Sequence, residues 1–467
     1  MDPSRWDRAC AGHLLRRAAF GGPPGEIDRL HRMGLHASVD WLLAGEEDAD
    51  LFPLPGELSD PAHFAGLRAA LAAARGDEAA MADARQALQR AERTAIEALR
   101  GWWLRRMRFG MHPLREMMTL FWHGHFASGM QKVRSAEAMA FQNETFRLHG
   151  LGDFRILATA MPADPAMMRY LDILGSSKQN PNENFARELM ELFLLGEGNY
   201  SEEDIRNASR AFTGYRLDRT QGRVVFQPAR ADSTPVEVAG KSGLRGPEEV
   251  VLTLIARPAC APHVAGRIWK FFTDREPTTA QRHHWGRVFR DSGFHVTRLL
   301  KAMFTSADFY AGEIRGAQIR SPVHWLVGTA KILEVPLSGD RDERAALRTL
   351  GQELFEPPNV KGWEGGRSWI GASTFLARCN LAGQLFLSEQ KDGGRRPDTR
   401  LLAPEAVRAD ATKLCDTLTH RLLAVQPGAD TRKALIDAAR GRGLPASDES
   451  IFEIVGLIMA LPEYQLT

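Results

Sequence analysis

The chain has 467 residues, of which 60 are Lys or Arg and 58 are Asp or Glu, so the formal net charge is +2. This balance provides no electrostatic basis for binding nucleic acid or an anionic membrane surface. Hydrophobic residues make up 44% of the chain and charged residues 25%, which is typical of a soluble globular protein with a large buried core. No run of about 18 apolar residues occurs, so no membrane-spanning helix is predicted.

The amino terminus lacks the features of an export signal. Asp2 and Asp7 carry negative charge, and no apolar segment of the length found in secretory signals accompanies them. The twin arginines Arg16 and Arg17 are followed by Ala-Ala-Phe and then by glycines, which is too short a stretch for a twin-arginine signal. We therefore expect a cytoplasmic protein.

Helical periodicity dominates the chain. Between residues 61 and 108, apolar residues recur at helical spacing, which predicts a long amphipathic helix or a helical hairpin broken near Gly76. The string LREMMTLFW predicts a helix that runs to Trp122. The string NPNE, which begins at Asn180, combines a capping residue with an early proline and predicts a helix that starts there and ends at Gly196.

Residues 218–246 interrupt the helical pattern. Two short β-compatible runs, 223–226 and 236–238, predict a small hairpin in this segment. The whole pattern predicts a mostly α-helical fold, a large multi-helix orthogonal bundle with a small β-hairpin excursion. We expect three parts: an N-terminal helical region over 1–110, a helical core over 111–390, and C-terminal helices over 391–467 that pack on the core.

Two histidines flank a glycine in the string FWHGHF. On a continuous helix His123 and His125 point about 200° apart, so they chelate one metal ion only if the helix ends between them, which Gly124 permits. A further ligand is needed, and no HExxH or HxHxDH string provides it. Both histidines are candidate ligands of a divalent metal. The alternative is that His123 caps the helix carboxyl end and His125 is a buried, hydrogen-bonded residue.

The segment PNENFARELMELFLLG has a wide apolar arc and a narrow polar stripe, so the helix is expected to be largely enclosed. The polar stripe contains Arg187, Glu188 and Glu191, and some of these charges are expected to be buried. A buried carboxylate needs a partner or has a raised pKa, and both situations are common in active sites. The alternative is a structural network in which Arg187 pairs with Glu183 and with Glu191 at helix-neighbour spacing.

The loop over residues 359–369, NVKGWEGGRSW, combines three glycines with two tryptophans and two cations. Aromatic faces suit a sugar or another ring, and cations suit an anionic group, so Lys361, Trp363 and Arg367 are candidate substrate-binding residues. The alternative is a tightly turned loop whose tryptophans pack onto the core. No P-loop, dinucleotide-binding glycine motif or GxSxG elbow occurs, which disfavours nucleotide binding, dinucleotide redox chemistry and α/β-hydrolase chemistry.

Several strings coincide with a bacterial family. The runs MTLFWHGHFAS, NPNENFARELMELFLLGEGNYSEEDIRNASRAFTGY, GQELFEPPNVKGWEGGRSWI and LPEYQ resemble the Domain of Unknown Function 1800 family, and the resemblance covers nearly the whole chain. It adds Lys132 to the candidate substrate-binding residues. The positions that match the family's motifs are His13, His123, His125, Lys132, Asp172, Asn182, Glu183, Asn184, Arg187, Glu188, Glu191, Lys361 and Trp363.

The resemblance also implies a biological setting. Many such proteins are exported, and their genes often lie beside genes for an exported sulfatase-like family with a twin-arginine signal, so co-export to the periplasm with a partner is the alternative location. The chain departs from the family where members commonly carry an HDxGxKxxLG-like string. Here Ala231 replaces the His and Val236 replaces the Lys, so any chemistry of that pair is lost or works differently.

Two functions remain in view. In the first, the protein is an acid/base or metal-assisted hydrolase that acts on a glycan or an anionic polymer. Glu188 is then the base or a metal ligand, Arg187 binds the negative charge of the substrate, and Glu183 belongs to the same site. In the second, the protein is a non-catalytic helical partner or maturation factor of the neighbouring sulfatase-like protein, and the tryptophan loop is an interface.

Overall fold

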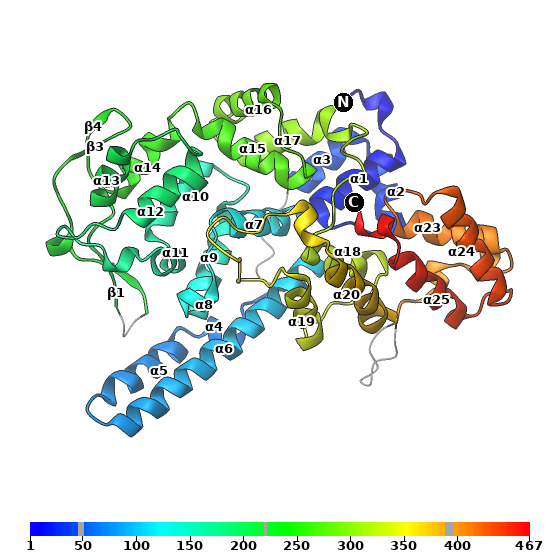
Figure 1. Ribbon diagram of the computed structural model, residues 1–467, viewed down its shortest axis with the longest axis horizontal. Coiled ribbons are helices and arrows are strands. Elements are labelled where there is room, and N and C mark those ends of the chain that lie inside the picture. Colours follow the sequence, from blue (N-terminus) through cyan, green and yellow to red (C-terminus); the bar gives the residue numbers. More distant parts are fainter. Residues whose placement is uncertain (45–50, 219–221, 388–395) are drawn as a thin grey trace.

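The computed structural model describes residues 1–44, 51–218, 222–387 and 396–467, and most of them form helices, as the periodicity predicts (Figure 1). Helices of the first third are α1 (Arg8–Ala19), α2 (Pro24–Met33), α3 (Leu35–Leu43), α4 (Gly56–Ser59), α5 (Pro61–Ala73), α6 (Glu78–Phe109), α7 (Pro113–His125), α8 (Met130–Val133), α9 (Ala136–His149) and α10 (Phe154–Ala160).

The middle and final parts of the chain are also mostly helical. The middle contains α11 (Pro165–Tyr170), α12 (Glu183–Glu188), a π-helix (Leu189–Leu194), α13 (Glu202–Ala211), α14 (Pro247–Ile255), α15 (Cys260–Thr273), α16 (Thr279–Asp291), α17 (Val296–Thr305), α18 (Pro322–Ile332) and α19 (Arg341–Leu350). The last part contains α20 (Ala372–Ala382), a second π-helix (Gly383–Leu387), α21 (Thr399–Leu402), α22 (Glu405–Arg408), α23 (Ala411–Leu422), α24 (Ala429–Gly441) and α25 (Asp448–Met459).

Helices α5 and α6 form a hairpin that projects from the body as an arm (Figure 1). The break falls where the sequence predicts it: Gly76 has a φ of +97°, a left-handed conformation that favours glycine, and the side chain of Asp77 then caps α6. Because α6 is 32 residues long, its second half reaches the body, where Trp102, Trp103 and Met107 are buried. The predicted helical hairpin is confirmed.

The β segment differs from the prediction in its pairing. Run 223–226 pairs with residues upstream of the predicted excursion, and run 236–238 pairs with the residues that follow it, so two separate antiparallel hairpins form. Their strands are β1 (Tyr215–Leu217), β2 (Val224–Phe226), β3 (Val236–Val238) and β4 (Lys241–Leu244). Residues 219–221 of the predicted excursion lie outside the described residues, as does the predicted boundary between residues 390 and 391.

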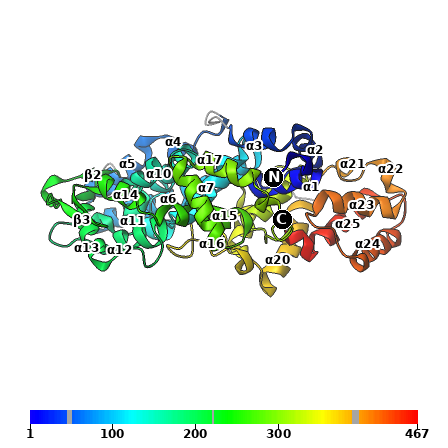
Figure 2. The same cartoon turned by 90° about the horizontal axis from the view of Figure 1, so that it is seen from above.

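Buried apolar side chains from Trp6 to Tyr464 form one continuous core cluster, which includes residues from all three predicted parts. The division of the chain at residues 110 and 390 stays a prediction. The body is elongated, with the β hairpins near one end and α23 to α25 at the other, and the two chain ends lie near each other (Figure 2). Within the described ranges, no helix is both long enough and apolar enough to cross a membrane.

A buried ion cluster fixes helix α7 between two neighbours. The carboxylate of Glu116, in the first turn of α7, accepts hydrogen bonds from Arg147 Nε of α9 at 2.6 Å and from Arg106 Nε of α6 at 3.2 Å. It also accepts one from Trp103 Nε1 at 2.8 Å. All four side chains are buried, so the charges compensate one another inside the core and hold the helix that carries His123 and His125.

Candidate functional site

Helix α7 continues through both histidines instead of ending between them, so Gly124 is a helical residue and the two rings point to different neighbours. His123 Nε2 accepts a hydrogen bond from the backbone N–H of Phe355 at 3.1 Å, whereas His125 Nε2 meets the carbonyl oxygen of Phe193 at 3.0 Å. Burial lowers the pKa of His123 to about 3. Chelation of one metal ion by both histidines requires the helix to end between them, and it does not. Within the described chain, no group of three or more His, Cys, Asp or Glu side chains is arranged to hold a metal.

Gly124 has another role, which is to let the tryptophan loop approach α7. A Cβ at Gly362 would lie 2.1 Å from the carbonyl oxygen of Gly124, and Gly362 has a φ of +78°. On the other side, a Cβ at Gly124 would meet the Trp363 ring at 3.7 Å. The HGH string and the KGW string are thus two halves of one backbone contact, and only glycine fits at residue 362.

Substitution of Gly362 by alanine should destabilise the protein more than the same change at Gly365. Gly365, on the same loop, has a φ of +79°, but the nearest atom to its would-be Cβ is 4.0 Å away. Gly365→Ala thus carries only the strain of a left-handed alanine, about 1–2 kcal/mol, and Gly362→Ala adds a backbone clash of about 1–3 kcal/mol. Urea unfolding measures both. Equal losses of unfolding free energy would show that the loop does not press on α7.

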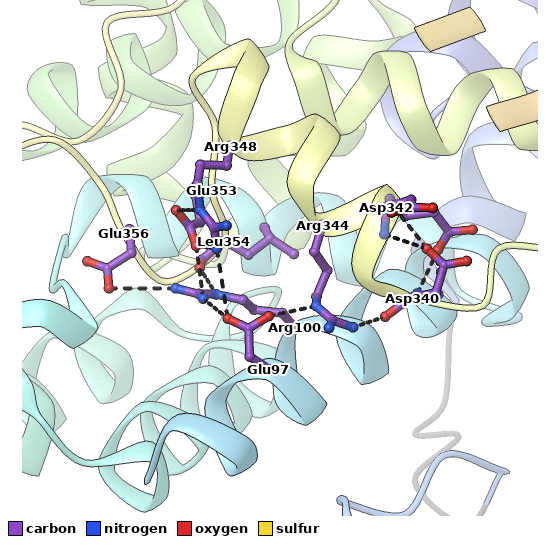
Figure 3. A network of polar contacts seen from close by, with 11 residues as sticks. Glu97, Arg100, Asp340, Asp342, Arg344, Arg348, Glu353, Leu354 and Glu356 are labelled. Atoms are coloured by element: carbon purple, nitrogen blue, oxygen red, sulfur yellow. Dashed lines mark hydrogen bonds and ion pairs between the residues drawn. The ribbon is translucent and has the colours of Figure 1, made fainter. Parts of the chain in front are cut away.

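The residues before this loop are held by the ion network in Figure 3. Arg100, a buried residue of α6, donates Nε–H to the carbonyl oxygen of Leu354 at 2.9 Å and pairs with Glu353 at 2.9 Å and with Glu356 at 3.6 Å. Glu97 adds a further carboxylate to the same guanidinium at 2.5 Å. The network holds the segment that includes Phe355, and the backbone N–H of Phe355 contacts His123. It therefore fixes the position of the residues that precede the tryptophan loop.

Between α7, α15 and the tryptophan loop lies a cavity of about 620 Å³, which we call the central cavity. Segments far apart in the sequence contribute to its wall: Arg17 comes from α1, His125 from α7, Arg267 from α15, and Gln318 from the segment before α18. The predicted substrate-binding residues Lys361, Trp363 and Arg367 also line it. A cavity of this size accommodates a small ligand or one unit of a polymer.

Positive charge predominates around the central cavity. Five Arg or Lys residues line it against two acids, Asp274 and Glu364; the cations are Arg17, Arg267, Lys270, Lys361 and Arg367. Burial raises the pKa of Asp274, and the nearby charge of Arg17 offsets part of that rise. Within the described residues, the side chains of Arg267 and Lys361 have no ion-pair partner. Phe121, Phe271, Trp363 and Trp369 supply apolar faces.

Three residues of the cavity wall carry buried polar atoms without a hydrogen-bond partner in the described chain: His125 Nδ1, Trp363 Nε1 and Arg17 Nε. A carbonyl oxygen accepts only, so the contact with Phe193 places the proton of His125 on Nε2 and leaves a lone pair on Nδ1. Burial lowers the pKa of His125 well below its ordinary value, which keeps the ring neutral. The wall thus offers one acceptor and two donors to a ligand.

The predicted acidic helix begins later than expected and changes its winding. Asn182, not Asn180, is the N-cap: its Oδ1 accepts the N–H of Asn184 at 2.9 Å, because Asn180 bridges to Ser177 instead. After Glu188 the helix becomes a π-helix, which ends before Gly196 as predicted. The wider turn separates Glu191 from Arg187, and Glu191 accepts a hydrogen bond from the Tyr200 hydroxyl at 2.8 Å. The predicted Arg187 to Glu191 pair is replaced by this contact.

Glu188, the last residue of α12, is half-buried and is not among the residues that line the central cavity. Burial and the charge of Glu191 raise its pKa, and the charges of Lys361 and Arg187 offset part of that rise. Within the described chain, the carboxyl group of Glu188 has no hydrogen-bond or ion-pair partner. Lys361 lines the cavity, and its charge lowers the pKa of Glu188. The acidic helix and the cavity wall are therefore electrostatically coupled through Lys361.

The other predicted residues lie away from the cavity wall. Arg187 pairs with Glu183 at 3.6 Å, as the structural alternative predicts, and forms a two-pronged pair with Glu202 at 2.7 and 2.9 Å. Lys132 pairs with Asp172 at 2.7 Å in an exposed position. These charges are already compensated by protein partners. Of the predicted site residues, His125, Lys361, Trp363 and Arg367 line the cavity.

Sequence reasoning missed the contribution of α1 and α15. Arg17 lies four residues after His13, and Arg267, Lys270 and Asp274 follow one another at spacings of three and four. Such spacing places side chains on one helix face, and this was the available signal. It does not show which face meets the cavity.

Comparison with known proteins gives one result. No match is found among curated proteins or among solved structures. The family model described as "Protein of unknown function (DUF1800)" matches residues 13–466, which is nearly the whole chain. The match includes every residue of the cavity wall named above, and the chain belongs to this family.

Proposed function

We propose that the central cavity binds an anionic ligand with a ring, such as a charged unit of a glycan or another anionic polymer. The observation that carries this proposal is the excess of five Arg and Lys over two acids around one cavity with aromatic walls. Guanidinium and ammonium groups without protein partners bind carboxylate, sulfate or phosphate strongly once water is displaced. Trp363 and Trp369 suit the face of a ring.

We further propose that bound substrate is hydrolysed, with Glu188 as the acid/base. In the charged form its carboxylate takes a proton from the attacking water as the water oxygen bonds to the substrate. The bond from the attacked atom to the departing oxygen breaks, and Glu188 gives that proton to the departing oxygen, which restores its charged form. Support comes from the half-buried position, the raised pKa and the absence of a competing partner in the described residues. Lys361 lines the central cavity, and its charge lowers the pKa of Glu188.

Replacement of Arg267 tests the binding role. Arg267→Gln should weaken binding of sulfate, glucuronate and a sulfated monosaccharide about tenfold or more, because it removes a charge-assisted hydrogen bond of about 1.5–3 kcal/mol. Isothermal titration calorimetry at low ionic strength measures the affinities. Neutral glucose should bind more weakly than glucuronate.

A matched control removes a nearby charge outside the wall. Arg275 follows α15 and donates to the carbonyl oxygen of Glu313, and Arg275→Gln should change each affinity less than about twofold, since exposed charges act weakly. Equal effects of the two substitutions, or no detectable binding of any anion to the unaltered protein, would contradict the proposal.

The second candidate is a non-catalytic partner role, and a specific surface favours it. Phe141 and Leu148 on α9 and Ile156 on α10 are more than half exposed, at 58%, 54% and 52%. Exposed apolar side chains that gather on neighbouring helices are typical of protein interfaces. Co-purification with the sulfatase-like protein tests this role. If the complex forms with the Arg267→Gln variant but not with the Phe141→Ser variant, the partner role is favoured over the hydrolase role.

A further inference from the structure

A second cavity, of about 610 Å³, lies beside α15 and α16 and shares no wall residue with the central cavity. Its wall contains Arg282, Arg287, Arg290 and His283 from α16, and His263 from α15. Within the part of the chain that the structure describes, no Asp or Glu lines it. We call it the α16 cavity.

The basic residues of α16 are gathered on one side. His283, Arg287 and Arg290 are spaced by four and three residues, which aligns them along one face of the helix. The positive charges of Arg287 and Arg290, three residues apart, repel one another. A bound anion removes that repulsion, whereas an unoccupied cavity retains it.

The guanidinium groups have few protein partners. Within the described residues, Arg287 has neither a hydrogen bond nor an ion pair. Arg290 donates one nitrogen to the carbonyl oxygen of Pro258 at 2.9 Å, which orients the group and leaves its other N–H groups unused. Arg282 donates one hydrogen bond to Oε2 of Glu276 at 3.4 Å, while Lys270 pairs with the other oxygen of that carboxylate at 2.6 Å. Donors therefore exceed acceptors around the cavity.

The facing wall does not supply the missing acceptors. The side chain of Asn199 donates to the carbonyl oxygens of Leu195 at 3.1 Å and Gly196 at 3.3 Å. His263 Nε2 donates to the carbonyl oxygen of Leu192 at 2.9 Å. The bond from His263 satisfies a carbonyl of the π-helix, the bonds from Asn199 satisfy carbonyls just after it, and together they hold the wall in place. Burial lowers the pKa of His263, so this ring stays neutral.

We propose that the α16 cavity binds a phosphate or sulfate group, either as the free ion or as an ester of a larger molecule. Three guanidinium groups around one space present pairs of N–H donors that match the oxygens of such a group. A doubly charged oxyanion fits this surplus of positive charge better than a carboxylate does. The inference is independent of the ligand and the chemistry of the central cavity.

Calorimetric titration of the full chain tests the inference, with phosphate, sulfate and glucose 6-phosphate as probes at low ionic strength. The double variant Arg287→Gln/Arg290→Gln should bind each probe at this site at least about tenfold more weakly. Within the described residues Arg287 has no partner and Arg290 donates only one hydrogen bond, to Pro258, so the double replacement should leave the fold intact, and circular dichroism verifies this. Tighter binding of glucose 6-phosphate than of phosphate supports an ester as ligand, and equal binding supports the free group.

Two further variants separate the α16 cavity from other cations. Arg298→Gln removes an exposed charge on α17 that donates to Ser292 and lines neither cavity, and it should leave the affinities within about twofold. Arg267→Gln should weaken anion binding in the central cavity and leave the affinity of the α16 cavity unchanged. The two proposals can therefore be refuted independently of each other. The inference is overturned if the double variant matches Arg298→Gln, or if the unaltered protein binds none of the probes at millimolar concentration.

Discussion

Glu116→Gln is expected to lower the free energy of unfolding by about 3–5 kcal/mol, because it removes a buried carboxylate charge that contacts two buried guanidinium groups, those of Arg106 and Arg147. Both side chains are almost entirely inaccessible to water, so no solvent replaces the lost charge. Urea unfolding followed by circular dichroism measures the change.

Glu144 provides the matched control for this substitution. Its carboxylate contacts the same guanidinium of Arg147 at 2.5 Å, but one-third of the Glu144 side chain is exposed. Glu144→Gln should therefore cost about 1 kcal/mol or less. Similar losses in the two variants would mean that burial does not decide the strength of these pairs.

The same cluster predicts a dependence on pH. Burial raises the pKa of Glu116, but the charges and hydrogen bonds of Arg147 and Arg106 outweigh burial, and the net result is a pKa below the ordinary value. The folded form thus holds the charged carboxylate more strongly than the unfolded form, whose pKa is about 4.3. The stability from Glu116 is present above that pH and is lost as the pH falls through the folded pKa. The difference between the protein and Glu116→Gln should shrink accordingly in acid.

Glu188→Gln is expected to reduce hydrolysis of an anionic polysaccharide by a factor of about 10² to 10⁴, the usual contribution of an acid/base group. Release of reducing ends from sulfated and uronate-containing polysaccharides measures the rate. Gln keeps the size of the side chain and cannot accept the proton, so affinity for sulfate should change little.

The control for this experiment is Glu197→Gln, an exposed carboxylate that follows the π-helix. It should leave both the rate and the affinity unchanged. If Glu188→Gln retains the full rate, the acid/base role of Glu188 is refuted while the anion-binding role of the central cavity still stands. If none of these polysaccharides is hydrolysed by the unaltered protein, the hydrolytic part of the proposal fails.

Local patterns predicted individual elements well. The break at Gly76 and the helix end before Gly196 depend on the conformations of single residues, and both follow from sequence. The π-helix did not, because the wider turn is stabilised by contacts outside it, such as the bonds from His125 and His263 to its carbonyl oxygens. That winding decides that Glu191 contacts Tyr200 and that Glu188 is left without a partner within the described residues.

At the candidate site, the tryptophan loop also has features that the sequence predicts and features that only the fold explains. Its composition predicts ligand-binding residues, and Lys361, Trp363 and Arg367 do line a cavity. Its reason for carrying Gly362, however, is a contact with Gly124 more than 200 residues earlier, which no local pattern reveals. The different roles of the two histidines also needed the fold, because only the packed structure shows that His125 lines the cavity and that His123 accepts a hydrogen bond from the backbone of Phe355.

The sequence by itself determined the helical class, the hairpin break at Gly76, the helix end before Gly196 and the membership of a family, since capping, glycine conformation and amphipathic spacing act within a few residues. Tertiary packing decided where charge accumulates. Arg17 lies 250 residues before Arg267, which lies 94 residues before Lys361, and a net charge of +2 gives no sign that they meet. Their meeting follows from the burial of apolar helix faces, which brings distant segments together and leaves their cations facing the same cavity.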